Sequence, residues 1–361
     1  MTTSHQGGVE YVDDHKVDRH LTRHVLADPP VTDTAGSTPG GAVNGTQAAP
    51  AASRLKPLRM FAMSITAFTV VGHLLLGFEQ SPVTPIAAVC FGYVIDLLLE
   101  YLDARAGDRK PGYAGGFGQL VSYLLPTHIA ALAAAMLLWG NESLWPYLFA
   151  VTVAVTSKHL IRIKVNGRWR HFLNPSNFGI AATLLLFPWV GFVPPYHFTN
   201  NVTGALDWLV PLGVLMAGTM LNAKLTGRWP LILGWVGGFG AQAVVRWAVL
   251  DHSLVAALVP MTGVAFILFT NYMITDPGTT PGRPRNQVVF GVTAAAVYGL
   301  LVAWHVVFGL FFALVITCML RGLVLVSAPW CRQAITESLR RRAGRGGSIV
   351  PPSTAGVDGA R

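Results

Sequence analysis

The chain has 361 residues, of which 52% are hydrophobic and 12% charged, and its formal net charge at pH 7 is +9. Soluble domains carry about 25% charged residues, so this composition and the mean hydropathy of +0.48 exclude a soluble globular protein. A positive charge is also typical of nucleic-acid binding, but here the lysines and arginines lie at the ends of apolar segments. That pattern indicates membrane topology. We therefore predict an all-α polytopic membrane protein that contacts membrane lipid and no nucleic acid.

Three regions follow from composition. Residues 1–55 are rich in Pro, Gly, Thr and Ala and predict a disordered cytosolic tail, because such a segment buries too little apolar surface to fold. His15, His20 and His24 in this tail are spaced for metal binding, although a solvated tail is the favoured interpretation. Residues 56–327 predict the membrane domain. Residues 328–361 predict a basic cytosolic tail, whose arginines are expected to lie near anionic headgroups.

Ten apolar segments in residues 56–327 approach the length of about 20 residues that crosses a bilayer. The predicted spans are 60–78, 83–102, 119–139, 144–160, 176–192, 206–222, 229–249, 254–275, 287–304 and 306–326. Lysine and arginine gather in every second loop, and Arg246 is the exception among the others. Because cytoplasmic loops collect these residues, we predict a multi-pass protein of the cell membrane with both termini in the cytosol.

Proline interrupts segments five and six at Pro188 and Pro211. Broken spans are typical of binding sites in transporters built from repeats. Ten spans are compatible with a five-plus-five inverted repeat, although no internal sequence identity supports one. In segment seven, small residues predict close helix packing; they are Gly234, Gly237, Gly238 and Gly240.

Two polar turns between apolar segments are the most informative stretches, and the predicted topology places both on the cytosolic side. The turn Thr275–Pro281 offers ligand-binding groups in Asp276, Thr279 and Thr280. A residue before proline leaves the α region, so we expect the preceding helix to end at Asp276. The turn from residue 171 to 177 and the residue before it offer Arg170, His171 and Asn174, a set that suits an anionic or carbonyl-rich ligand. Helix capping by Asn174 or Ser176 is the structural alternative.

Three carboxylates, Asp96, Glu100 and Asp103, are spaced to share one face of segment two. A carboxylate inside the membrane is a functional hypothesis by default, and Asp96, the deepest, is the candidate for handling a proton or cation. An ion pair of Asp96 with Arg162 or Lys158 is the alternative.

His128 is a second candidate for proton transfer, because it follows Pro126 in segment three and histidine titrates near neutrality. A hydrogen bond to the carbonyl that Pro126 frees is the alternative. His73, His159 and His305 are predicted to be isolated and structural. The three cysteines have no metal-binding spacing, so no metal site is predicted.

The two turns together resemble one known family. Arg170–Gly179, with Asn174, Pro175 and Asn177, is followed by Thr275–Pro281 and then by Gln287–Gly291. Over roughly residues 58–326, this pattern resembles a membrane protein shared by two complexes, as RnfD in Rnf electron-transport complexes and as NqrB in the sodium-translocating NADH:quinone oxidoreductase. The resemblance implies a helical electron-transfer subunit that binds flavin and helps to couple redox chemistry to ion movement.

The family attaches FMN covalently to the threonine of a Ser-Gly-Ala-Thr motif in an outward loop. Here the nearest match is Thr203-Gly204-Ala205-Leu206, and leucine has no hydroxyl to form the phosphoester. Asp207 beside it would also repel a phosphate. We therefore expect no covalent FMN at Leu206. A non-covalent flavin, FMN or riboflavin, is predicted at Arg170, His171, Asn174, Asp276, Thr279 and Thr280.

This departure and the long N-terminal tail resemble the divergent UnbU-type membrane proteins of enediyne biosynthesis. Two functions fit these features. The first is a membrane redox protein that exchanges electrons with a partner subunit or a quinone. The second is a transporter or self-resistance exporter of a small natural product, which the missing hydroxyl at Leu206 favours. A scaffold subunit with neither activity is the third possibility.

Overall fold

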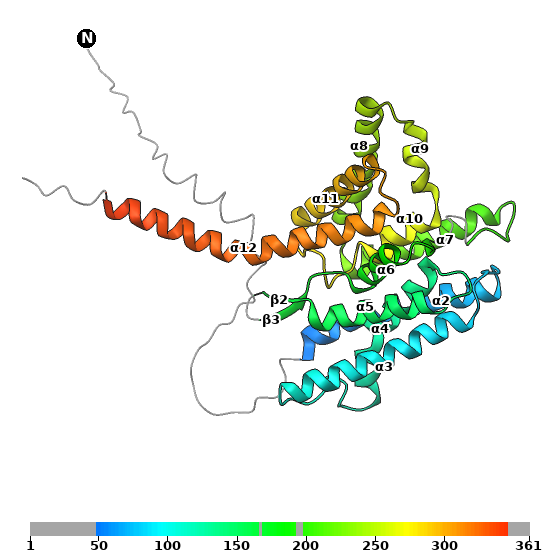
Figure 1. Cartoon of the computed structure of the whole chain (residues 1–361), viewed down its shortest axis with the longest axis horizontal. Helices are drawn as coiled ribbons and strands as arrows, with labels where there is room; N and C mark the ends of the chain where they lie inside the picture. Colours follow the sequence, from blue (N-terminus) through cyan, green and yellow to red (C-terminus); the bar gives the residue numbers. More distant parts are fainter. Residues whose placement is uncertain (1–47, 166–167, 193–197, 346–361) are drawn as a thin grey trace, which may run out of the picture. The chain divides into compact units, whose positions relative to one another are not determined.

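The computed structural model describes residues 48–165, 168–192 and 198–345, with side chains between Leu55 and Ala328. The tail histidines, including His15, lie outside the described residues. The first described helix, α2, begins at Ala48, inside the range predicted as a disordered tail. The last helix, α12, continues beyond residue 327 to Arg345, so both predicted boundaries of the membrane domain fall within helices (Figure 1).

Helices dominate the described residues. The first half of the chain contains α2 (Ala48–Leu74), α3 (Val83–Ala106), α4 (Phe117–Leu137), α5 (Trp145–Leu160) and α6 (Pro175–Leu186). The second half contains α7 (Leu206–Leu221), the π-helix η1 (Asn222–Thr226), α8 (Trp229–Leu250), α9 (Leu254–Leu258), the 3-10 helix η2 (Val259–Thr262), α10 (Val264–Leu268), the π-helix η3 (Phe269–Met273), α11 (Pro284–Ala303) and α12 (Gly309–Arg345).

In the part of the chain that the structure describes, four short strands form two antiparallel pairs. Strand β1 (Leu138–Trp139) pairs with β4 (Gly191–Phe192), and β2 (Arg162–Val165) pairs with β3 (Arg168–His171). The pair β2–β3 is a hairpin that follows α5. The pair β1–β4 joins the segment after α4 to the segment after α6.

The predicted class, an all-α polytopic membrane protein, is confirmed, but the count of ten spans is not. Among the described residues, seven helices are long and apolar enough to cross a membrane, and the pair Leu254–Thr262 and Val264–Met273, bent by 67°, makes an eighth. Helices α5 and α6 have 16 and 12 residues. At 1.5 Å per residue they extend about 24 and 18 Å, less than the hydrocarbon core of about 30 Å.

Proline affects the two interrupted segments differently. Helix α6 ends at Leu186, before Pro188, as its sequence predicts. Helix α7 instead runs through Pro211, so the predicted break in segment six is wrong. The irregular part of that segment comes later, where α7 widens into the π-helix η1.

Corresponding helices of the two halves contact corresponding partners. In the first half α2 packs on α4, α3 on α5 and α5 on α6; in the second half α7 packs on α10, α8 on α11 and α11 on α12. The first helices of the halves, α2 and α7, also contact each other, as do the last, α6 and α12. The correspondence is partial, because the contacts of α4 with α5 and with α6 have no counterpart of similar extent at α10, and the five-plus-five repeat stays a prediction.

Two of the four predicted glycines make close contact with a neighbouring helix. A Cβ atom on Gly234 would lie 2.6 Å from the Val288 carbonyl oxygen of α11, and one on Gly238 would lie 2.8 Å from the Ala295 side chain. Gly237 and Gly240 face open space. The prediction of close packing is therefore right for the pair spaced by four residues, which lies on the face that α8 turns to α11.

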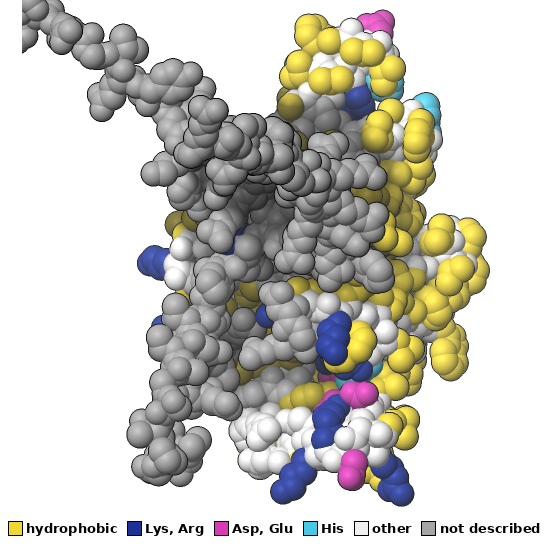
Figure 2. Space-filling view, turned by 90° about the vertical axis from the view of Figure 1, so that its left-hand side faces the viewer, with side chains coloured by type: hydrophobic (Ala, Val, Ile, Leu, Met, Phe, Trp, Pro, Cys, Tyr) yellow, Lys and Arg dark blue, Asp and Glu magenta, His cyan; other side chains and the backbone are white. Residues whose placement is uncertain are grey.

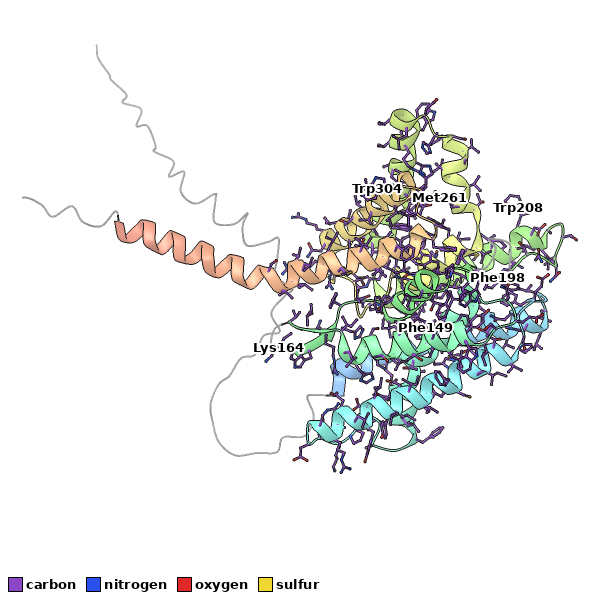
Figure 3. The ribbon with its side chains drawn as sticks, viewed as in Figure 1. Phe149, Lys164, Phe198, Trp208, Met261 and Trp304 are labelled. Atoms are coloured by element: carbon purple, nitrogen blue, oxygen red, sulfur yellow. The ribbon has the colours of Figure 1, made fainter. Side chains whose placement is uncertain are left out.

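The loops predicted on one side of the membrane meet at one end of the helices, here called the basic end. It comprises the described residues 107–116, 161–165, 168–174, 222–228 and 275–283. Arg162 contacts Asp103 near the end of α3 here, and Arg228 contacts Pro281. Figure 2 looks onto this end and shows its lysine and arginine side chains in dark blue. In Figure 3, Lys164 marks the basic end, and Phe198 and Trp208 mark the opposite end.

Candidate functional site

Asn174 joins the two polar turns. Its Oδ1 caps helix α6 by accepting from the Asn177 backbone N–H at 3.1 Å and from the Ser176 hydroxyl at 2.9 Å. Its Nδ2 donates to the Met273 carbonyl at 2.8 Å, just before the second turn. The capping alternative is therefore present, and the same side chain brings the two turns together at the basic end.

The second turn is organised by Asp276. Its carboxylate accepts from the Gly278 N–H at 3.0 Å and from the Thr279 hydroxyl at 2.8 Å, and its carbonyl accepts from the Thr280 hydroxyl at 2.6 Å. The preceding π-helix ends at Met273, before Asp276, as predicted. Thr279 and Thr280 are buried and donate their hydroxyl protons within the turn, so each can offer a ligand only an oxygen acceptor.

Two arginines that sequence reasoning missed hold this turn. Arg228 donates through one terminal nitrogen to the Pro281 carbonyl and through the other to the Pro277 carbonyl, the latter at 3.4 Å. Arg321, from α12, donates to the Thr279 carbonyl at 3.0 Å. The signal of Arg228 was a basic residue flanking an apolar segment, which topology explains equally well, whereas Arg321 lies inside the predicted span 306–326.

A cavity of about 150 Å³ lies between the two turns. Its polar wall comprises Lys158, His171, Asn174, Ser176 and Asp276, and its apolar wall includes Leu58, Phe61, Pro126, Ile129, Tyr272 and Pro277. The polar wall therefore carries a basic side chain, Lys158, and a carboxylate, Asp276. The cavity therefore combines apolar surface with a few convergent polar groups, the usual composition of a small-molecule site.

The neighbouring residues His171 and Arg170 differ in their relation to this cavity. Successive residues of a strand point to opposite faces, and on β3 His171 lines the cavity whereas Arg170 is exposed. A Cβ atom on Gly278 would lie 3.2 Å from His171 Nε2, so the imidazole packs against the Asp276 turn. Burial lowers the pKa of His171, and the charge of Asp276 opposes that shift in part.

We expect His171 to make the folded protein sensitive to acid. Its pKa is lowered in the folded state, so the unfolded chain binds the proton first as the pH falls through about 6.5. The contribution of neutral His171 to the free energy of unfolding is therefore fully present above that pH and is lost as the pH falls below it. The variant His171→Gln should show a smaller fall in melting temperature between about pH 7.5 and 5.5. An equal fall in both proteins would contradict the assignment.

Asp96 is fully buried at the centre of a hydrogen-bonded cluster. Its Oδ1 accepts from His159 Nε2 at 2.8 Å and from the Tyr123 hydroxyl at 3.2 Å. Its Oδ2 accepts from Lys158 Nζ at 2.8 Å and from the Thr127 hydroxyl. The predicted alternative, an ion pair with Lys158, is present, and the role of Asp96 in handling a proton stays a prediction.

The prediction that His159 is isolated is wrong, because α3 and α5 pack together and bring His159 against Asp96. No spacing within one segment could reveal this contact. Lys158 is the other missed residue of the site, because the sequence offered it only as a partner of Asp96. In the structure it also lines the cavity.

Glu100 and Asp103 continue from Asp96 toward the basic end. Arg109 contacts Glu100 at 2.6 Å and Asp103 at 2.7 Å, and these hydrogen bonds raise the pKa of Arg109 further above its usual range. Ligand atoms of Glu100, Asp103 and His159 lie within 4.8 Å of one another. Because Arg109 already compensates both carboxylates, this geometry does not make a metal site.

His128 lies apart from the cavity. Its Nε2 is 2.8 Å from the Thr66 hydroxyl and its Nδ1 is 2.8 Å from the Tyr93 hydroxyl, so the predicted bond to a carbonyl freed by Pro126 is wrong. Side chains of α2 and α3 satisfy the imidazole instead. Leu206 is exposed and begins α7 at the opposite end from the cavity.

The chain is similar in sequence to one class of membrane protein, the D subunit of ion-translocating oxidoreductase complexes. Over 104 residues it is 27% identical to this protein from Yersinia pseudotuberculosis serotype O:1b (strain IP 31758), with 28% of each chain covered. Over 105 residues it is 25% identical to the counterpart from Yersinia enterocolitica serotype O:8 / biotype 1B (strain NCTC 13174 / 8081), with 29% of each chain covered. No family model matches the chain. The chain thus matches less than a third of the length of these relatives, and within that part it is similar to a membrane electron-transport protein.

Proposed function

We propose that this chain is a membrane electron-transport subunit that binds a flavin non-covalently in the cavity between the Asn174 and Asp276 turns. The observation that carries the proposal is the cavity itself, where both turns of the family-like pattern line one space at the basic end. Similarity to a component of ion-translocating oxidoreductase complexes supports the electron-transport role and a partner subunit.

The residues fit part of a flavin. An apolar wall with Phe61 and Tyr272 suits a planar aromatic ring, and Lys158 and the Asn174 turn suit its polar edge. The volume of about 150 Å³ is below the roughly 300–1,000 Å³ of sites that bury a drug-sized ligand. One end of the ring would therefore be enclosed, with the ribityl chain outside. Any phosphate would then also lie outside, so the cavity suits FMN and riboflavin alike.

When bound, a flavin supplies one- and two-electron redox chemistry. The residues of this chain bind and tune it. Lys158 places a cation in the wall, which favours a reduced, anionic ring by electrostatic attraction. His171 and Asn174 orient the polar edge, and Arg228 keeps the Asp276 turn in place through its carbonyls. A quinone or a partner subunit would exchange the electrons.

The test is the colour of the purified protein. In mild detergent, the proposal predicts flavin absorbance in the visible range, released into the supernatant when the chain is precipitated with acid. A colourless protein would refute flavin binding. Colour that stays with the precipitated chain would contradict the conclusion drawn from Leu206.

One observation favours the second candidate, a transporter or exporter of a small natural product. Two further cavities continue from the first along α2 toward the opposite end. One of about 40 Å³ shares Phe61, Ile129, Ser176 and Tyr272 with it, and the next, of about 310 Å³, shares Phe68 with the second. This series would give an apolar compound a path along the span. The resemblance to UnbU-type proteins of enediyne biosynthesis supports an enediyne as the compound that is transported. Retention of such a compound by a colourless protein would support this candidate.

A further inference from the structure

A chain of titratable groups connects the cavity with the surface at the basic end. Lys158 belongs to both, because it lines the cavity and donates to Asp96 at 2.8 Å. Asp96 in turn contacts His159 Nε2 at 2.8 Å. His159 lies with Glu100 and Asp103 in one group, whose ligand atoms are within 4.8 Å of each other.

The carboxylates of α3 form a ladder along one helix face. At 1.5 Å per residue, Glu100 stands about 6 Å and Asp103 about 10 Å nearer the basic end than Asp96. Side-chain exposure rises in the same order, from 0% for Asp96 to 8% for Glu100 and 40% for Asp103. The ladder therefore begins in solvent and ends at a fully buried group beside the cavity.

The other groups facing the ladder do not block it. Arg109 and Arg162 form ion pairs with Asp103 at the solvent-exposed end of the ladder, and Arg162 also donates to the His159 carbonyl. From α4, Tyr123 and Thr127 donate to Asp96. Lys158 Nζ also lies 5.3 Å from the centre of the Tyr123 ring. Every contact of Asp96 is thus a hydrogen-bond donor, and two of the four, Lys158 and His159, have side chains of the kind that can give and take a proton.

We propose that Lys158, Asp96 and His159 conduct protons from the basic end into the cavity. Lys158 Nζ would donate a proton to a ligand reduced in the cavity and would be left as a neutral amine. The His159 imidazolium returns one proton to Lys158 through the Asp96 carboxylate, and His159 is reprotonated from solvent at Asp103. One proton enters at the surface for each proton that the ligand gains. The electrons come separately, from the reductant.

This inference rests on the proposed function for the identity of the ligand. It adds the side of the membrane from which the proton is taken up. The route opens at the same end as the two turns, so the proton taken up on reduction comes from that side and does not cross the membrane. Asp96 and His159 are positioning and relay residues, since neither lines the cavity. Lys158 is the group that touches the ligand.

The test compares His159→Gln with wild type and with the control His73→Gln. Glutamine retains a donor to Asp96 but does not titrate, and His73 lies on α2, where it bonds the Thr69 carbonyl. The purified proteins are reduced with dithionite in weak buffer, and a pH-indicator dye follows proton uptake while absorbance follows the flavin. The melting temperature and the bound flavin are measured first.

His159→Gln should keep its flavin and melting temperature but take up protons about 100-fold more slowly, and added imidazole should restore the rate. His73→Gln should match wild type. Uptake at the wild-type rate in a folded, flavin-bearing His159→Gln protein would overturn the route alone. A wild-type protein without flavin would overturn the proposed function, and this inference with it.

Discussion

Replacement of Asp96 by alanine is expected to lower the free energy of unfolding by about 3–5 kcal/mol. Asp96 is fully buried and contacts Lys158, His159, Tyr123 and Thr127. Its loss leaves the ammonium of Lys158, whose side chain is 17% exposed, without a counter-charge in a low-dielectric site. Removal of one partner of a buried pair costs more than the pair contributes, because the remaining charge is uncompensated.

Thermal unfolding in detergent, followed by circular dichroism, measures this effect. The double variant Asp96→Ala/Lys158→Met should recover most of the loss, since both charges are then absent. The control Asp103→Ala removes a carboxylate that is 40% exposed and should cost less than about 1 kcal/mol. Equal losses for Asp96→Ala and the double variant would show that the buried charge of Lys158 is not the cause.

Replacement of Asn174 by alanine is expected to cost about 2–4 kcal/mol. Loss of the cap of α6 costs about 1 kcal/mol, and the buried Met273 carbonyl, which accepts from Asn174 Nδ2, is left unsatisfied at a cost of about 1–3 kcal/mol. The two turns would also separate, because this hydrogen bond joins them directly.

Asn174→Asp separates the two roles. Aspartate retains the oxygen that caps α6 but has no amide to donate to Met273, so its melting temperature should lie between those of wild type and Asn174→Ala. Ser176→Ala, which removes one donor to Asn174 Oδ1 and leaves both bonds from Asn177 and to Met273 possible, serves as the matched control for stability. If Asn174→Asp is as stable as wild type, the bond between the turns contributes nothing measurable.

Local and periodic features could be predicted from the sequence. The alternation of basic loops placed the Asn174 and Asp276 turns at one end, and the structure brings them together. The spacing of Asp96, Glu100 and Asp103 predicted one helix face, and all three contact basic partners on that face. These features depend on the helix period and on charge at a membrane surface, which a sequence displays directly.

Contacts between distant helices could not be predicted in this way. His159 was assigned a structural role because it looked isolated in the sequence, yet Asp96 lies against it from α3. Arg228 looked like an ordinary topology signal, yet it binds two carbonyls of the Asp276 turn. The predicted bounds of α5 are confirmed, whereas the length of α6 was overestimated, because its segment was predicted to continue to residue 192 and the helix ends at Leu186. Hydrophobicity continues beyond the helix into strand and loop residues that pack inside the protein.

The central claim is that a flavin binds between the two turns, and the ratio of bound flavin to chain tests it most directly. Wild-type protein, purified in mild detergent and passed through gel filtration, should carry flavin at close to one per chain. Asn174→Asp, if folded, should carry much less, and Asn201→Asp, which makes the same change outside the cavity, should match wild type. Undiminished flavin in folded Asn174→Asp, or no flavin in wild type, would contradict the account.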